Sequence, residues 1–382
     1  MKILLASSSS GSRGGGELYL LYLARALADR GHEPMLWASS HPRMDELARS
    51  FSSIGEVHRC DYVNTYDRTL RSLASYRDSA SARRVADSWR ASGAEFVHIN
   101  KQNLEDGLDL LAAARIASIP SLCTIHITQG ARYLRARFAG LRDAVSRRAL
   151  KAYDGLLVTV PEQRRRELRE FVGDDSRVRV VYTGVPLFDL GMREPLRAAK
   201  RAELGVAADQ MLIVAVGRLV PQKRPLAFLE QARLIAAANP TTKFLWVGDG
   251  GLAAEWDARV AKLGLGGTVQ RLPWQGDVLP ALFAADVFLH VAEFEGLPLA
   301  ILEAMSAGLP CAITEHLLAE MPFIGADDAL CADATGSWIA TLADRPRLAA
   351  MGARMRRLAE EQFSFASMAA SYDALYRETM QR

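Results

Sequence analysis

The sequence predicts an α/β protein made of two doubly wound, Rossmann-like domains that face each other across a deep cleft. Three observations support this prediction. The chain has 382 residues, which is long for a single domain. Short apolar runs alternate with amphipathic helical patterns, as is typical of parallel strands covered by helices on both faces. The alternation stops at an irregular segment near 185–195 and then starts again.

Expected strands and helices follow one another in a regular order. In the first half, apolar runs that predict strands are KILLAS, PMLWAS, EFVHI, SLCTIH and GLLVTV, with helices between them over 17–30, 104–117 and 161–172. The second half restarts with MLIVAVG, KFLWVG, TVQRL, DVFLHVA and LPCAIT. We place the domains at 1–185 and 186–365, and expect a C-terminal helix over 366–382 to pack back towards the N-terminal domain.

Composition narrows the class of protein. With 49% hydrophobic and 24% charged residues the chain is ordinary for a globular protein. The net charge of +3 argues neither for nor against nucleic acid, and we expect no such partner. No apolar run approaches the ~20 residues that span a bilayer, and the N-terminus is too short in its apolar part for a secretory signal. Four cysteines without paired spacing predict reduced thiols in the cytoplasm and no zinc site.

The loop after the first strand contains Gly15 and Gly16, which open a helix. Glycines let a ligand approach the backbone, and a helix N-terminus presents free N–H groups to an anion. A tight strand-to-helix turn is an equally good explanation. A nicotinamide dinucleotide site is a weak alternative, because the glycines do not match G-x-G-x-x-G and the second strand ends in WASS without an acidic residue.

The first strand of the second half runs into GRLVPQK, where Arg218 and Lys223 stand five residues apart. Either residue alone would be expected to be a solvated surface charge. Two cations at the end of one strand suit a diphosphate, whose charge an ammonium and a guanidinium can share. The two together favour an anion site.

The stretch EFEGLPLAILEA places Glu295 just before an expected helix and Glu303 within it. The two acids either cap and decorate this helix or bind the hydroxyl groups of a ligand. The backbone amides of Gly296, Leu297 and Leu299 at the helix start are candidate phosphate ligands. Cations for a diphosphate and carboxylates for hydroxyls together describe a nucleotide-sugar site.

These motifs resemble the retaining glycosyltransferases of family 4, which have the GT-B fold. The resemblance rests on GRLVPQK, VGDG and the E-x7-E signature EGLPLAILE, and it runs over nearly the whole chain. The match is loosest over 40–95. Two departures are Thr183, where family members often have asparagine, and EGLP, where they commonly have EGFG.

The resemblance implies a metal-independent enzyme that transfers a hexosyl group, with retention, from a UDP- or GDP-sugar to a glycan or glycolipid, as in cell-surface polysaccharide or glycolipid synthesis. It implies a C-terminal donor domain, an N-terminal acceptor domain and no cofactor besides the donor. Arg218 and Lys223 would stabilise the leaving diphosphate, Glu295 would hold the transferred sugar and Glu303 the ribose. His126 ends the strand SLCTIH; a lone histidine there is usually structural, but the matching family position faces the donor sugar.

Residues 132–151 predict a basic amphipathic helix, with Leu134, Phe138, Leu141 and Val145 at helical spacing among arginines. Such a helix either packs on the protein or lies on an anionic membrane surface, which would make a cytoplasmic protein peripheral at the inner face of the plasma membrane. Two other functions stay open: a non-catalytic sugar-nucleotide-binding subunit and a sugar-nucleotide epimerase. The donor base, the acceptor and the oligomeric state are not indicated.

Overall fold

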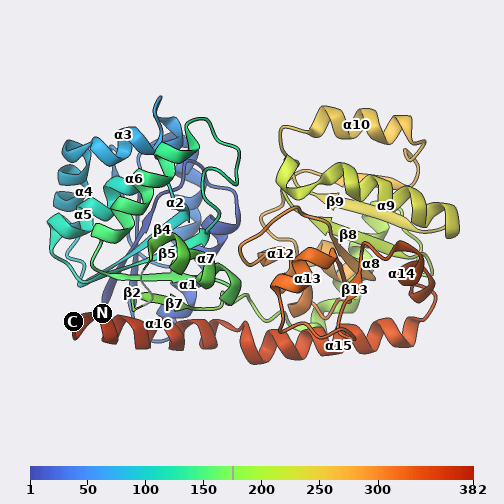
Figure 1. Ribbon diagram of the computed structural model, residues 1–382. Helices are drawn as coiled ribbons and strands as arrows, with labels where there is room; N and C mark the ends of the chain where they lie inside the picture. The colour runs from blue at the N-terminus through green and yellow to red at the C-terminus, as the bar shows by residue number, and fades with distance from the viewer. Residues whose placement is uncertain (174–175) are drawn as a thin grey trace. The chain divides into compact units, whose positions relative to one another are not determined.

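The chain folds into two compact units, each built on one parallel sheet. The computed structural model describes residues 1–173 and 176–382 (Figure 1). The first unit comprises Met1–Gly184 together with Phe365–Arg382, and the second comprises Val185–Ser364. The predicted pair of Rossmann-like α/β domains is therefore confirmed.

The first unit has a seven-stranded sheet in the order β3-β2-β1-β4-β5-β6-β7. Its neighbouring strands pair in parallel, and their bounds are Lys2–Ser7 (β1), Glu33–Ser39 (β2), Val57–Cys60 (β3), Phe96–Asn103 (β4), Ser121–Ile127 (β5), Leu156–Thr159 (β6) and Val178–Val180 (β7). Strand order reverses between β1 and β4. In doubly wound sheets ligands bind beyond the carboxyl ends of the strands at such a reversal.

Helices of the first unit cover both faces of this sheet (Figure 1). They are Gly15–Ala28 (α1), Asp45–Phe51 (α2), Ser72–Arg77 (α3), Ser79–Ala91 (α4), Leu108–Ala117 (α5), Ala139–Ala152 (α6), Glu162–Val172 (α7) and Phe365–Met380 (α16), with short 3₁₀ turns at Pro42–Met44 (η1) and Thr65–Asp67 (η2). The prediction of a helix over 132–151 is wrong about where the helix begins, because α6 begins only at Ala139. Arg135 and Phe138 have φ angles of 52° and 58°, which interrupt a helix.

The last helix, α16, belongs to the first unit although α15 before it belongs to the second. Tyr372 and Tyr376 lie one turn apart and so share a face of α16. The Tyr372 hydroxyl bonds that of Tyr19 on α1 at 2.6 Å, and the Tyr376 hydroxyl lies 2.9 Å from Nδ1 of His98 on β4. Asp373 binds Arg30 and His32 beyond α1. These buried polar contacts fix the helix to the first unit.

The second unit has a six-stranded parallel sheet in the order β10-β9-β8-β11-β12-β13. The strands are Leu212–Val216 (β8), Lys243–Val247 (β9), Val269–Leu272 (β10), Val287–His290 (β11), Cys311–Ile313 (β12) and Leu330–Cys331 (β13). The α-helices are Arg193–Leu204 (α8), Pro225–Ala238 (α9), Ala253–Lys262 (α10), Leu279–Ala284 (α11), Leu299–Ser306 (α12), Glu315–Glu320 (α13), Thr335–Thr341 (α14) and Arg345–Gln362 (α15), and 3₁₀ turns lie at Leu190–Met192 (η3) and Pro221–Lys223 (η4). Its strand order reverses between β8 and β11.

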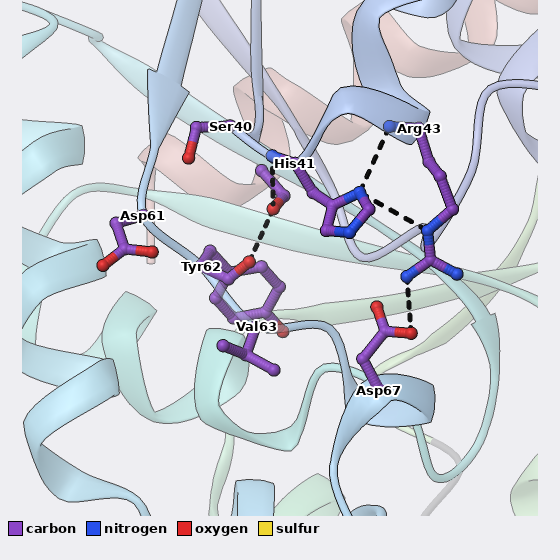
Figure 2. A pocket seen from close by; sticks show the side chains of 8 residues that line it. Ser40, His41, Arg43, Asp61, Tyr62, Val63 and Asp67 are labelled. Atoms are coloured by element: carbon purple, nitrogen blue, oxygen red, sulfur yellow. Dashed lines mark hydrogen bonds and ion pairs between the residues drawn. The ribbon is translucent and has the colours of Figure 1, made fainter.

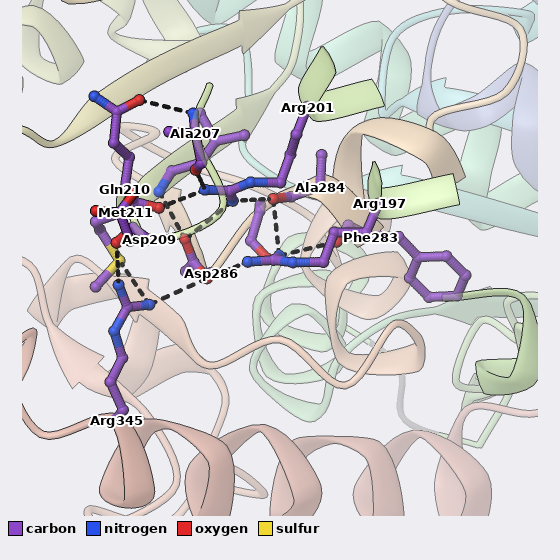
Figure 3. Close-up of polar contacts among 12 residues, drawn as sticks. Arg197, Arg201, Ala207, Asp209, Gln210, Met211, Phe283, Ala284, Asp286 and Arg345 are labelled. Carbon is purple, nitrogen blue, oxygen red and sulfur yellow. Dashed lines mark hydrogen bonds and ion pairs between the residues drawn. The ribbon is translucent and has the colours of Figure 1, made fainter. Parts of the chain in front are cut away.

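A cluster of charges holds the start of β11 in place (Figure 3). The carboxylate of Asp286 accepts the Leu212 amide at 2.7 Å, which joins the starts of β8 and β11. Arg197 binds the same carboxylate at 2.8 Å and Arg345 at 3.1 Å. Since the β8–β11 reversal is where a ligand is expected, this cluster fixes the strands that position the candidate site.

Candidate functional site

The loop after β8 carries the two cations that the sequence predicts for a diphosphate. Gly217 follows β8, and η4 leads from the loop into α9. A Cβ atom on Gly217 would lie 3.4 Å from the Lys223 side chain, so the stem of Lys223 lies close against the glycine. Arg218 is exposed, and its guanidinium has no hydrogen-bond or ion-pair partner within residues 1–173 and 176–382. Arg218 is therefore available to a ligand.

Lys223 and Glu295 come together across the β8–β11 reversal. The Lys223 ammonium forms a salt bridge with Oε1 of Glu295, and the side chains are only 17% and 9% exposed. Nε2 of His290, the last residue of β11, lies 3.3 Å from the same oxygen. The pairing follows from the fold, because β8 and β11 are neighbours in the sheet.

Opposing effects set the pKa of Glu295. Burial raises it, but the Lys223 ammonium and the His290 imidazole together outweigh burial and lower the pKa to about 2. Burial also lowers the pKa of His290, and its bond to Glu295 offsets this only in part. At neutral pH the cluster is thus a carboxylate, an ammonium and a neutral imidazole. The neutral ring can donate to Glu295 only with its proton on Nε2.

Helix α12 begins where the sequence predicts, directly after Pro298. The Pro298 carbonyl accepts the amides of Ile301 at 3.0 Å and Leu302 at 3.3 Å. Leu299, as the first helical residue, has no intrahelical acceptor for its own amide. Glu303 lies in the second turn and is 4% exposed. Its burial disfavours the simple explanation that Glu303 is a solvent-exposed side chain on the outer face of the helix.

Gly296 and Leu297, in the loop between Glu295 and this helix, are each partly exposed. That their amides bind a phosphate stays a prediction. The structure thus joins Lys223 directly to Glu295 and places Arg218 on the same loop as Lys223.

In the first unit, Gly16 and His126 are linked through one buried amide. The Asn100 side chain on β4 donates to the Gly16 carbonyl at 3.2 Å and bonds Nε2 of His126 at 2.7 Å. Burial lowers the pKa of His126 to about 4, so its imidazole is neutral at pH 7. Gly15 is the exposed first residue of α1. The structure therefore brings Gly16 and His126 together at the carboxyl ends of the strands, beside the β1–β4 reversal and the end of β5.

Two residues of these clusters are missing from the sequence prediction. His290 lies near the end of the expected strand DVFLHVA, and Asn100 directly follows the expected strand EFVHI, so each is close to a strand end expected from the sequence, where ligands bind; in the structure β4 continues to Asn103. Their positions were a usable signal. The sequence does not show that His290 contacts Glu295 or that Asn100 contacts His126.

Two family models match the chain. The model "Glycosyltransferase Family 4" matches residues 13–187, and "Glycosyl transferases group 1" matches residues 210–344. Together the two matches take in most of the chain. The protein belongs to glycosyltransferase family 4.

Among curated relatives, the chain is similar to UDP-Gal:α-D-GlcNAc-diphosphoundecaprenol α-1,3-galactosyltransferase of Escherichia coli, with 31% identity over 203 residues. That match covers 52% of this chain, and the chain spans about half (52%) of the relative's length. It is also similar to D-inositol 3-phosphate glycosyltransferase of Mycolicibacterium paratuberculosis, with 29% identity over 80% of this chain and 70% of that protein.

Solved structures share the fold. The structure of HepE from Anabaena in complex with UDP and glucose superposes with a TM-score of 0.77 at 19% identity, covering 99% of this chain and 100% of that chain. WaaG, a glycosyltransferase involved in lipopolysaccharide biosynthesis, gives a TM-score of 0.70 at 17% identity, covering 98% of this chain and 99% of that chain. The chain therefore has the GT-B fold.

Proposed function

We propose that this protein is a retaining glycosyltransferase that moves a hexosyl group from a UDP-sugar to a hydroxyl group of a lipid-linked glycan. The observation that carries the proposal is the Lys223–Glu295 salt bridge beside the exposed Arg218, at the ends of β8 and β11. Family membership supports the reaction class. The UDP-galactose donor and diphosphoundecaprenol-linked acceptor in the name of the E. coli relative support the choice of substrates.

Each residue has a role suited to its charge. Arg218 and Lys223 bind the diphosphate, aided by the amides of Gly296, Leu297 and Leu299. The Glu295 carboxylate accepts hydrogen bonds from hydroxyls of the transferred sugar, and Glu303 accepts those of the ribose. Lys223 exchanges its contact with Glu295 for one with the diphosphate when the donor binds. We assign the donor to the second unit and the acceptor to the first.

The reaction is a substitution at the anomeric carbon with attack from the face that the leaving group occupies. The bond between C1 and the diphosphate oxygen breaks, and the acceptor oxygen forms a new bond to C1. The departing diphosphate takes the proton of the acceptor hydroxyl. Arg218 and Lys223 stabilise the negative charge that grows on the diphosphate. In the first unit His126, neutral at pH 7, hydrogen-bonds a sugar hydroxyl, and the exposed Gly15 leaves room at the start of α1, whereas a Cβ atom on the buried Gly16 would meet the Gln102 side chain.

The test is to incubate the protein with UDP-galactose, UDP-glucose, UDP-N-acetylglucosamine and GDP-mannose in excess EDTA. At least one UDP-sugar should be hydrolysed slowly, and NMR should show the product with the anomeric configuration of the donor. Binding of a UDP-sugar without turnover would favour a non-catalytic subunit, and an epimerised donor would favour an epimerase. Loss of activity that Mg²⁺ or Mn²⁺ restores would contradict metal independence.

We assign His290 a positioning role, because its ring holds the oxygen of Glu295 that also faces Lys223. Replacing His290 with glutamine should lower kcat by about tenfold and leave the affinity for UDP unchanged. It should also raise the pKa of Glu295 above its present value of about 2, since one bond to the ionised form is weakened. The acidic limb of the pH–rate profile should then move to higher pH. A kcat loss without that movement would indicate a purely structural role.

A basic and apolar surface on the first unit suits the proposed lipid-linked acceptor. Tyr133, Phe138 and Leu141 are 59%, 61% and 56% exposed. Arg132, Arg135 and Arg137 are exposed among them, whereas Arg142 is buried against Glu105. We define these six exposed residues as the 132–141 surface and propose that it lies on an anionic membrane. In the part of the chain that the structure describes, no helix is long and apolar enough to cross a bilayer.

Replacing the three exposed arginines of this surface with glutamine should lower binding to vesicles that contain anionic lipid. Each arginine near such a surface contributes ~1 kcal/mol, so the expected loss is about 10²-fold, and added salt should have a similar effect. The control removes the same charge from scattered exposed arginines, Arg25, Arg49 and Arg83. Sedimentation with vesicles measures the membrane binding of both triple variants. Equal losses in the two triple variants would show that only net charge matters.

A further inference from the structure

A pocket in the first unit has no role in the proposed donor site. It lies at the carboxyl ends of β2 and β3 and has a volume of about 290 Å³ (Figure 2). This volume is near the lower end, ~300 Å³, of the range for small-molecule sites. Its polar lining and one apolar side are formed by Ser40, His41, Arg43, Asp61, Val63 and Asp67. Such a lining suits a small polar ligand.

The charges in the pocket disfavour an anionic ligand. Arg43 forms a salt bridge with Asp67 at 2.5 Å, so one cation and one carboxylate compensate each other. The second carboxylate, Asp61, is exposed and has no hydrogen-bond or ion-pair partner among the described residues. The net charge of the lining is therefore negative when His41 is neutral. A negative pocket repels phosphate and accepts hydrogen bonds from neutral hydroxyls.

The remaining groups fit a sugar ring. Nδ1 of His41 accepts the Arg43 amide at 3.2 Å, so a neutral His41 carries its proton on Nε2, where it can donate. The Ser40 hydroxyl offers both a donor and an acceptor. Val63, 51% exposed, provides an apolar side for the C–H face of a ring. Donors, acceptors and an apolar side together match a pyranose.

The walls of the pocket are fixed by the core beneath them. Tyr62 is 3% exposed; its hydroxyl donates to Asp109 at 3.0 Å, and its ring contacts Trp37 edge-on with centroids 5.2 Å apart. The Ser39 hydroxyl donates to the Tyr62 carbonyl at 2.5 Å and so joins the ends of β2 and β3. A pre-formed site binds a small ligand with less loss of conformational freedom.

The pocket adjoins the glycine loop that opens α1. The Ser12 hydroxyl donates to the carbonyl of Arg43, a pocket residue, and Arg13 pairs with Glu46 at 2.8 Å just beyond η1. Gly15 and Gly16 follow directly in sequence. The pocket is therefore next to the loop that the proposed function assigns to the reacting sugars.

We infer that this pocket binds a neutral saccharide ring of the acceptor, adjacent to the ring whose hydroxyl is glycosylated. The inference rests on the proposed function and adds to it a class of acceptor. The acceptor therefore carries at least two sugar rings, one with the reacting hydroxyl and one in the pocket. The Asp61 carboxylate accepts hydrogen bonds from hydroxyl groups of the ring in the pocket.

Saturation-transfer NMR on the full chain, with methyl glycosides of glucose, galactose and N-acetylglucosamine as probes, tests the inference. At least one glycoside should bind the wild type at millimolar concentration. Asp61→Asn removes the charge and Ser40→Tyr fills the pocket, and each should weaken that binding about tenfold or more. Asp154→Asn is the matched control, because Asp154 is an 88% exposed acid elsewhere on the first unit. UDP affinity should be the same in all four proteins.

Three results would overturn the inference: no neutral glycoside binds, both pocket variants bind like the wild type, or inorganic phosphate displaces the glycoside. Failure of the proposed function looks different. The wild type would then hydrolyse no UDP-sugar, whether or not it binds UDP, and whatever the glycoside experiment shows.

Discussion

Replacing Lys223 with alanine should lower kcat for sugar transfer by about 10²-fold or more. This is the scale of losing one group that stabilises charge in the transition state. Lys223 is also the ion-pair partner of a buried carboxylate, so the variant should lose stability as well. The combination of a catalytic and a stability effect distinguishes Lys223 from an ordinary surface lysine.

The stability effect should depend on pH. In the wild type the pKa of Glu295 is about 2, below its ordinary value of ~4.3, so the carboxylate stabilises the fold above pH ~4.3. That contribution, about 3 kcal/mol, is lost as the pH falls from ~4.3 towards 2. Without Lys223, burial is less compensated and the pKa of Glu295 should rise. Urea unfolding should therefore show a large difference between Lys223→Ala and wild type at pH 7, and this difference should shrink as the pH falls from ~4.3 towards 2.

Arg218→Ala is the matched control for this experiment. Arg218 is exposed and has no partner in the described parts of the chain, so its removal should change the free energy of unfolding by less than ~0.5 kcal/mol. Its kcat should nevertheless fall by about 10²-fold, because we assign it to the same diphosphate. Near-wild-type rates in both variants would contradict the diphosphate site.

Changing the two glutamates of the E-x7-E signature to glutamine should have different kinetic effects. Glu303 is assigned to the ribose, which it holds equally in the ground state and the transition state, so Glu303→Gln should mainly raise KM for the donor. Glu295 is assigned to the reacting sugar, where charge develops, so Glu295→Gln should mainly lower kcat. If the acids only capped a helix, each change should cost less than ~1 kcal/mol of stability and leave the donor affinity unchanged.

Free UDP provides the control for these roles, because it has the ribose but no transferred sugar. Its affinity should fall in Glu303→Gln. It should not fall in Glu295→Gln, because loss of the carboxylate frees Lys223 for the diphosphate. Calorimetry measures both, and equal UDP affinities in the two variants would refute the assignment.

The fold could be predicted because the strands carry an unusually clear signal. Strands buried on both faces, such as β1 and β8, read as continuous apolar runs in the sequence. Strand β3 has only partly buried or exposed residues, VHRC, and lies at the sheet edge, so it had no such run and was missed. The turn before α6 was missed for a related reason. The pattern over 132–151 is amphipathic, but pattern alone does not reveal the positive φ angles of Arg135 and Phe138.

The candidate site could be predicted in its residue types but not in its contacts. Strand-end loops identify Lys223 and Glu295 separately, and both were predicted to face substrate. Their mutual salt bridge depends on β8 and β11 being adjacent, which the sequence does not state. The same holds for His290, whose importance comes only from the Glu295 oxygen beside it. Tertiary proximity, not residue chemistry, was the missing information.

A crystal structure of the protein with UDP bound tests the central claim most directly. We predict that the diphosphate contacts Lys223 and Arg218 and that the ribose hydroxyls lie within ~3.2 Å of the Glu303 carboxylate. Lys223 should have moved from Glu295 to the diphosphate. UDP bound away from the loops after β8 and β11, or bound there with its ribose remote from Glu303, would contradict the account.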